Sequence, residues 1–173
     1  MTWTKGEKAM DNQTRETTPG LKPVRVSAID NYPHLLFSND LNCNRTVFGG
    51  RLLEIADRLA GTVAFQHSGE TCVTAGLDEV RFIAAAREGD LIIFKASVNR
   101  TWNSSMEVGV KVFGNNPTTD KTWTVISMYF TFVAVGPDGK KHQIIGVVPE
   151  TEDEKRRFEE ADERRKRRLA LKK

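Results

Sequence analysis

One carboxylate lies among unusually small residues near the middle of the chain. The segment around Asp57 has a helical repeat, and its neighbours on the helical wheel are Gly50, Leu53, Ala60, Gly61 and Ala64. Four of these five are glycine or alanine, which leaves room for another molecule to approach the carboxylate. In this interpretation, Asp57 belongs to a surface that a ligand can approach closely. Alternatively, it belongs to the solvated edge of the helix, next to charged residues such as Arg58.

A pair of glycines opens the same helical segment. Gly49 and Gly50 can simply permit a tight entry into the helix. They can also let a substrate carbonyl reach the unpaired backbone N–H groups of the first turn, where the helix dipole favours developing negative charge. Both interpretations remain open on this pattern alone.

Apolar residues predict one internal helix over residues 49–67. They recur at the helical spacing as Leu52, Ile55, Ala56, Leu59 and Val63. Ser68 and Gly69 have the chemistry of a helix C-terminus. This helix would position both the glycine pair and Asp57.

After residue 70 the hydrophobic period changes from a helical one to the period of two that is typical of strands. Residues 72–82, 91–102, 106–112 and 123–135 are predicted strands, and a short one is predicted at 35–37. Short turns join the successive strands, which favours an antiparallel meander over parallel βαβ units. The expected fold class is α+β, with one helix against a sheet of five to six strands.

The two ends of the chain differ from its centre in composition. Residues 1–26 are polar and rich in turn formers, and are predicted to be a flexible N-terminal arm before a domain over 27–149. Residues 150–173 are highly charged, with acids first and bases last, which suits the dipole of a C-terminal helix.

Composition excludes several classes of protein. With 173 residues, 39% hydrophobic residues and a net charge of +3, the chain can fold around one core and is neither disordered nor collagen-like. Two cysteines are too few for a disulfide framework, and the histidines and cysteines lack the spacing of a metal site. No apolar stretch suits a signal peptide or a membrane span, so we expect a cytoplasmic protein without membrane insertion.

The basic run from Arg164 to Arg168 raises nucleic-acid binding as an alternative function. Acids are interleaved just before it, at Glu159, Glu160, Asp162 and Glu163, and they argue against such a partner. We therefore expect no nucleic-acid partner.

The segment from Asp40 to Asp57 resembles the signature of the hotdog-fold acyl-CoA thioesterases, most closely the bacterial and brain-type acyl-CoA hydrolases. A D-x-N tripeptide that ends at Asn42 precedes an F-G-G turn, and an acid follows seven residues after the second glycine. The resemblance covers about residues 34–168. It implies a single hotdog domain, in which a long central helix is wrapped by a curved antiparallel sheet, and a charged C-terminal helix.

The resemblance also implies an activity and a site. It suggests hydrolysis of the acyl-CoA thioester, with Asp57 as general base or nucleophile, Asn42 orienting water or the carbonyl, and the Gly50 N–H as oxyanion donor. It implies dimers in which Asn42 and Asp57 of one site come from different subunits, with further assembly into a trimer of dimers. No cofactor or metal is expected, since coenzyme A is part of the substrate.

Further residues are expected to contact the coenzyme A part of the substrate. The phosphates call for basic residues, and the candidate contacts are Gly49, Phe48, Arg81, Phe82, Ser104, Ser105, Arg164 and Arg165. Each basic residue can equally be a solvated surface charge, and each serine a plain turn residue. A non-catalytic acyl-CoA-binding or sensing protein with the same fold is the alternative function.

The chain departs from the family pattern at two positions. The family often has glycine where this chain has Arg45, and often a proline near Ala85. Arg45 could narrow or recharge the mouth of the site, which bears on substrate choice more than on reaction type.

Overall fold

The computed structural model describes residues 20–171. Five strands form an antiparallel sheet in the order β2-β4-β5-β6-β3. Their bounds are Ile29–Leu35 for β2, Cys72–Phe82 for β3, Leu91–Thr101 for β4, Ser105–Asn116 for β5 and Lys121–Ala134 for β6. The predicted α+β class is therefore confirmed, and the structure matches the hotdog arrangement.

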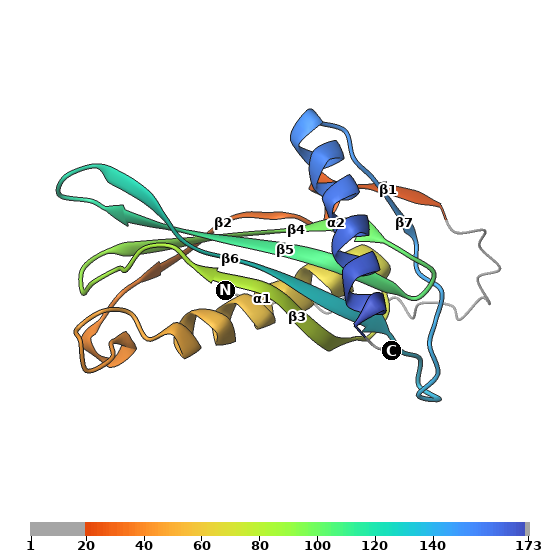
Figure 1. The fold of residues 1–173 in the computed structure, drawn as a ribbon, viewed down its shortest axis with the longest axis horizontal. Helices are drawn as coiled ribbons and strands as arrows, with labels where there is room; N and C mark the ends of the chain where they lie inside the picture. The colour runs from red at the N-terminus through yellow and green to blue at the C-terminus, as the bar shows by residue number, and fades with distance from the viewer. Residues whose placement is uncertain (1–19, 172–173) are drawn as a thin grey trace, which may run out of the picture.

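The helix α1, Gly49–Ser68, packs along one face of the sheet, and α2, Glu152–Ala170, crosses the other face (Figure 1). The core lies between α1 and the sheet. It contains the predicted apolar stripe of α1 together with residues such as Phe94, Met128 and Phe132. Gly69 ends α1 in the left-handed region, with φ of 71°, as expected for a glycine C-cap.

The strand order differs from a simple meander. Strands β4, β5 and β6 follow one another, but β3 pairs with β6 at one edge of the sheet and is not adjacent to β4. The edge position matters for the site, because β3 leaves one row of its backbone hydrogen-bonding groups without a partner strand in a single chain.

Residues before the sheet also differ from expectation. Of the predicted flexible arm, residues 1–19 lie outside the described part, whereas residues 20–26 are folded. Strand β1, Leu21–Pro23, pairs in parallel with β7, Gly146–Val148, and a 3-10 helix, η1, follows at Val24–Val26. A second 3-10 helix, η2, covers Ser38–Asp40. The Lys22 ammonium donates to the backbone carbonyls of Gln66 and His67, so this segment caps the C-terminus of α1.

The terminal helix is fixed at its start by a capping box. The Thr151 hydroxyl accepts from the Glu154 N–H, and the Glu154 carboxylate accepts from the Thr151 N–H. Over residues 20–171, no helix is long and apolar enough to cross a membrane.

Candidate functional site

The N-terminus of α1 is open, and two exposed aromatic rings flank it. Phe48 occupies the N-cap position and has no side-chain group that could cap the helix. Backbone N–H groups in the first turn of a helix lack partners within it, so the N–H of Gly50 is available to a ligand. The oxyanion role predicted for Gly50 requires such an N–H.

The glycine pair lets two aromatic rings lie close against the start of α1. A side chain at Gly49 would come within 2.9 Å of the Phe82 ring, and one at Gly50 within 2.5 Å of the Phe48 ring. Both rings are more than half exposed. The predicted contacts Phe48, Gly49 and Phe82 therefore gather with Gly50 at one end of α1.

The loop that leads into α1 is held together by Asp40. Its carboxylate is buried and accepts from the Phe37 backbone N–H at 3.1 Å and from Arg51 Nε at 3.1 Å. Burial raises the pKa of Asp40, but these donors and the nearby His34 outweigh burial, so the pKa lies below its usual value. The carboxylate stays charged and fixes the loop against the first turn of α1.

The side chain of Asn42 organises the same loop. Its Oδ1 accepts from the backbone N–H groups of Asn44 at 2.9 Å and Thr46 at 3.3 Å. Its Nδ2 donates to the Thr46 hydroxyl at 3.0 Å. An amide nitrogen carries two hydrogens, so one N–H of Asn42 has no partner among the described residues.

Asp57 is half-buried on α1 and faces the edge strand β3. The Thr74 hydroxyl, on β3, donates to Asp57 Oδ1 at 2.8 Å. Asp57 is thus not simply part of a solvated helix edge, because a specific donor from another element orients its carboxylate.

Asp57 and Gly50 are too far apart to serve one reacting carbonyl within a single chain. Seven helical residues separate them, which corresponds to about 10 Å along the axis of α1. Asn42 comes before the helix in the chain, in the loop that leads to its N-terminus. Within a single subunit, these groups therefore do not converge on one point.

The basic residues predicted to bind coenzyme A fall in different places. Arg81 is exposed and lies 3.7 Å from Glu79. Arg165 stacks on the Trp102 ring and donates to the Ser105 hydroxyl at 3.4 Å, so two of the predicted contacts meet there. Ser104 precedes β5 and is half-buried.

Arg164 differs from the prediction that it contacts the substrate. Its guanidinium is 5% exposed and donates to both oxygens of the fully buried Glu107, at 2.7 and 3.1 Å. It also lies over the Tyr129 ring. Because both of these partners are under α2, Arg164 attaches this helix to the sheet and is not available to a phosphate.

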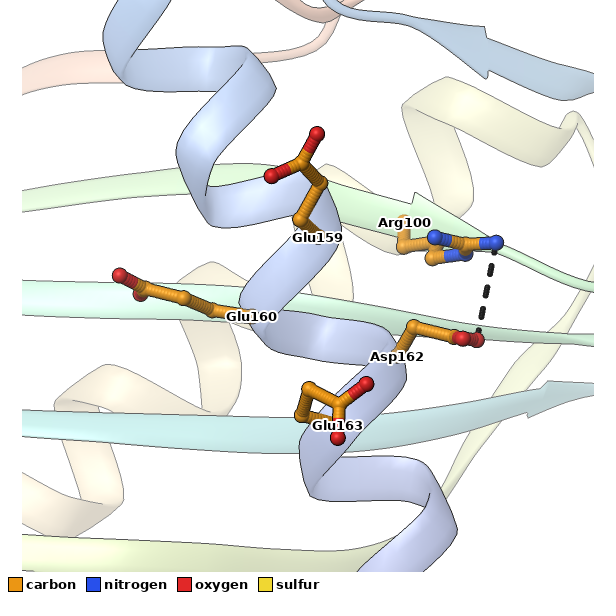
Figure 2. A pocket seen from close by; sticks show the side chains of 5 residues that line it. All are labelled: Arg100, Glu159, Glu160, Asp162 and Glu163. Atoms are coloured by element: carbon orange, nitrogen blue, oxygen red, sulfur yellow. Dashed lines mark ion pairs between the residues drawn. The ribbon is translucent and has the colours of Figure 1, made fainter.

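An open hollow of ≈ 500 Å³ lies beside α2, away from Asp57. Its lining is Arg100, Glu159, Glu160, Asp162 and Glu163. In Figure 2, Glu160 and Asp162 project to opposite sides of α2, and Asp162 points toward Arg100, with which it pairs at 3.6 Å. These side chains repel the phosphates of coenzyme A, so the hollow is not the substrate site. Over residues 20–171, no group of three His, Cys, Asp or Glu side chains could hold a metal ion.

Comparison with known proteins places the chain in a family. The Thioesterase superfamily profile matches residues 44–121. The acyl-CoA thioester hydrolase YkhA of Bacillus subtilis (strain 168) is 35% identical over 119 residues, which are 69% of each chain. The chain belongs to the acyl-CoA thioesterase family.

Solved structures of the family agree with this fold. An acyl-CoA hydrolase from Staphylococcus aureus, in complex with butyryl coenzyme A and coenzyme A, superimposes with a TM-score of 0.83 at 33% identity, covering 88% of this chain and 92% of that one. A hexameric acyl-CoA thioesterase has a TM-score of 0.83 at 35% identity, covering 88% and 99%.

The mammalian relatives are longer. The cytosolic acyl coenzyme A thioester hydrolase of Mus musculus is 37% identical over 130 residues, or 73% of this chain. The chain spans about a third of that protein's length, since the match covers 34% of it.

Three further structures of the Staphylococcus aureus family member carry alanine in place of an asparagine, an aspartate and a threonine. The asparagine precedes the aspartate by 15 positions, and the threonine follows it by 17. In this chain, Thr74 is a residue that sequence reasoning did not single out. The structure draws attention to Thr74 through its hydrogen bond to Asp57.

Proposed function

We propose that this protein hydrolyses the thioester of acyl-CoA to a free acid and coenzyme A. The observation that carries the proposal is the oriented carboxylate of Asp57, held by Thr74 at 2.8 Å. Asn42 and Thr74 lie 15 positions before and 17 positions after Asp57, which is the spacing of the substituted residues in the Staphylococcus aureus hydrolase.

The chemistry uses two parts of α1, the carboxylate of Asp57 near its middle and the N–H of Gly50 in its first turn. In one route, Asp57 takes a proton from water, and the resulting hydroxide adds to the thioester carbonyl. In the other, the carboxylate attacks directly and water cleaves the acyl-enzyme anhydride. In both, the Gly50 N–H stabilises the oxyanion, the C–S bond breaks, and coenzyme A leaves as a thiolate that gains a proton.

The site is proposed to form between subunits, with Asp57 from one and Asn42 and Gly50 from the other. Strand β3 supports this arrangement, because it is an edge strand next to Asp57 and exposes Val73 and Leu77. Pairing of two such edges would bring the two subunits together. Hexameric family members support a trimer of dimers.

The remaining expectations belong to the same proposal. Arg81, Arg165, Ser104 and Ser105 are proposed to lie near the coenzyme A, with Phe48, Gly49 and Phe82 near the acyl thioester. No cofactor is required by this chemistry. A cytoplasmic location is proposed, because the Mus musculus relative described above is a cytosolic hydrolase.

The test is release of free thiol from acyl-CoA substrates of increasing chain length, with wild type beside Asp57→Ala. We expect wild-type turnover, and loss of hydrolysis in Asp57→Ala with coenzyme A binding retained in a calorimetric titration. Binding without turnover by the wild type would favour the non-catalytic acyl-CoA-binding alternative. A wild-type rate in Asp57→Ala would remove Asp57 from the mechanism.

A further inference from the structure

Arg45 has a backbone conformation that disfavours its own side chain. Its φ is 56°, in the left-handed region that glycine adopts without cost. Asn42 forms hydrogen bonds on both sides of Arg45 in the sequence, some through its backbone and some through its side chain. The Asn42 backbone pairs with the Arg45 N–H at 2.9 Å and with the Thr46 carbonyl at 2.8 Å, while its side chain binds Asn44 and Thr46. The loop therefore imposes this conformation on whatever residue occupies position 45.

The side chain of Arg45 does not offset that cost within the fold. It is exposed and takes part in none of the ion pairs or side-chain hydrogen bonds found over residues 20–171. The nearest acid in the loop, Asp40, is already bound to Arg51 and to the Phe37 N–H. Arg45 is thus a cation without a carboxylate partner in the described part of the chain.

The cation lies in the same loop as Asn42, one of the residues of the proposed site. Arg45 lies three residues after Asn42 and four before Gly49, in the loop that leads to the open N-terminus of α1. A glycine would suit the backbone better, and the arginine side chain is exposed. Strained backbone residues cluster at functional sites, and Arg45 combines such strain with an unpaired charge in the loop of the proposed site.

We infer that Arg45 is a specificity residue that binds an anionic group of the substrate. This rests on the proposed hydrolysis of acyl-CoA. The anion is a carboxylate at the far end of the acyl chain or a phosphate of coenzyme A. Both accept charge-assisted hydrogen bonds from a guanidinium.

Three substitutions separate the cation from the strain. Arg45→Ala removes the guanidinium but keeps a side chain in the left-handed region, Arg45→Gly removes both, and Arg45→Lys keeps a positive charge. Each is assayed by thiol release from butyryl-CoA, succinyl-CoA and butyryl-pantetheine, the last of which lacks all phosphates. Melting temperature and oligomer mass are measured for every variant.

The rate of hydrolysis is expected to depend on the positive charge at position 45. The melting temperature is expected to depend on whether position 45 carries a side chain. Arg45→Ala and Arg45→Gly should both lose about 10- to 100-fold in kcat/KM, which corresponds to loss of one charge-assisted contact, and Arg45→Lys should lose less. Arg45→Gly alone should melt about 2–4 °C higher than wild type. Oligomer mass should stay unchanged in all three.

The three substrates identify the anion. Loss confined to succinyl-CoA assigns Arg45 to an acyl carboxylate, whereas equal loss with both CoA esters and none with butyryl-pantetheine assigns it to the phosphates. Unchanged rates with all three, an equal loss with butyryl-pantetheine, or a changed oligomer mass would overturn the inference. If the wild type hydrolyses none of the substrates, the proposed function itself fails.

Discussion

The hydroxyl of Thr74 donates to the carboxylate of Asp57 across the gap between β3 and α1, at 2.8 Å. This bond leaves the second carboxylate oxygen of Asp57 for water or for the thioester. It also connects the edge strand to the helix at the proposed site, so that any movement of β3 would reorient the carboxylate.

Removing this donor should lower turnover more than substrate affinity. In Thr74→Ala, Asp57 keeps its charge but loses its orientation, so kcat should fall by about 10-fold or more with little change in KM. Thr74→Ser retains the hydroxyl and is expected to restore most of the rate. Steady-state thiol release measures both, and an equal fall in the alanine and serine variants would argue against an orienting role.

A site shared between subunits should be rebuilt from two inactive variants. Asn42→Ala and Asp57→Ala each lack one half of the site, but a dimer of one with the other contains one intact pair. With random pairing in an equal mixture, co-refolded subunits should regain about a quarter of wild-type activity. If both residues act within one chain, the mixture will stay as inactive as its parents.

The buried pair of Arg164 and Glu107 should behave as a structural contact. Arg164→Met leaves the fully buried Glu107 carboxylate with a hydrogen bond from Asn99 but no cation, which should lower the free energy of unfolding by about 3–5 kcal/mol. Arg164→Met combined with Glu107→Leu should recover much of this loss. Urea unfolding at fixed protein concentration measures both, and a double variant less stable than Arg164→Met would contradict this account.

Buried His67 should make the fold sensitive to mild acid. Burial, and then the charge of Lys22, lower its pKa from 6.5 to about 4, so the folded protein binds the proton less well than the unfolded chain. The stability that comes from keeping His67 neutral is therefore fully present above pH 6.5. It is lost as the pH falls toward 4. Between pH 7 and pH 5, we expect a loss of about 2 kcal/mol in the free energy of unfolding.

His67→Gln provides the control for this effect. The substitution removes the titrating group, so the part of the pH dependence between pH 6.5 and 4 that belongs to position 67 should disappear. Urea unfolding of both proteins at pH 7 and pH 5 tests it. Parallel losses of stability in the two proteins would assign the acid sensitivity to other groups.

Local patterns predicted α1 well, because one regular element carries a long apolar stripe with a glycine at its end. They located β2 poorly, since Asp30, Asn31 and Pro33 break the alternation of this exposed edge strand. They missed β1 and β7 entirely, since three-residue strands contain too little of a period to detect.

The burial of Glu107, its pairing with Arg164 and the contact of Thr74 with Asp57 depend on contacts between distant segments, which local sequence patterns do not show. Glu107 alternates with apolar residues in β5, a pattern typical of a strand with one solvated face, but α2 covers that face and buries it. Its partner Arg164 lies 57 positions away and looked like part of a basic surface run. Thr74 is one polar residue in an edge strand, and only the fold brings it to Asp57.

The most direct test of the account is the rate of coenzyme A release from butyryl-CoA by Asp57→Asn. Asparagine keeps the shape of the side chain and an oxygen that can accept from Thr74, so the fold and the substrate contacts should be preserved. The account predicts a fall in kcat of at least about 100-fold with coenzyme A still bound. A rate close to that of wild type would contradict the assignment of Asp57 as the catalytic residue.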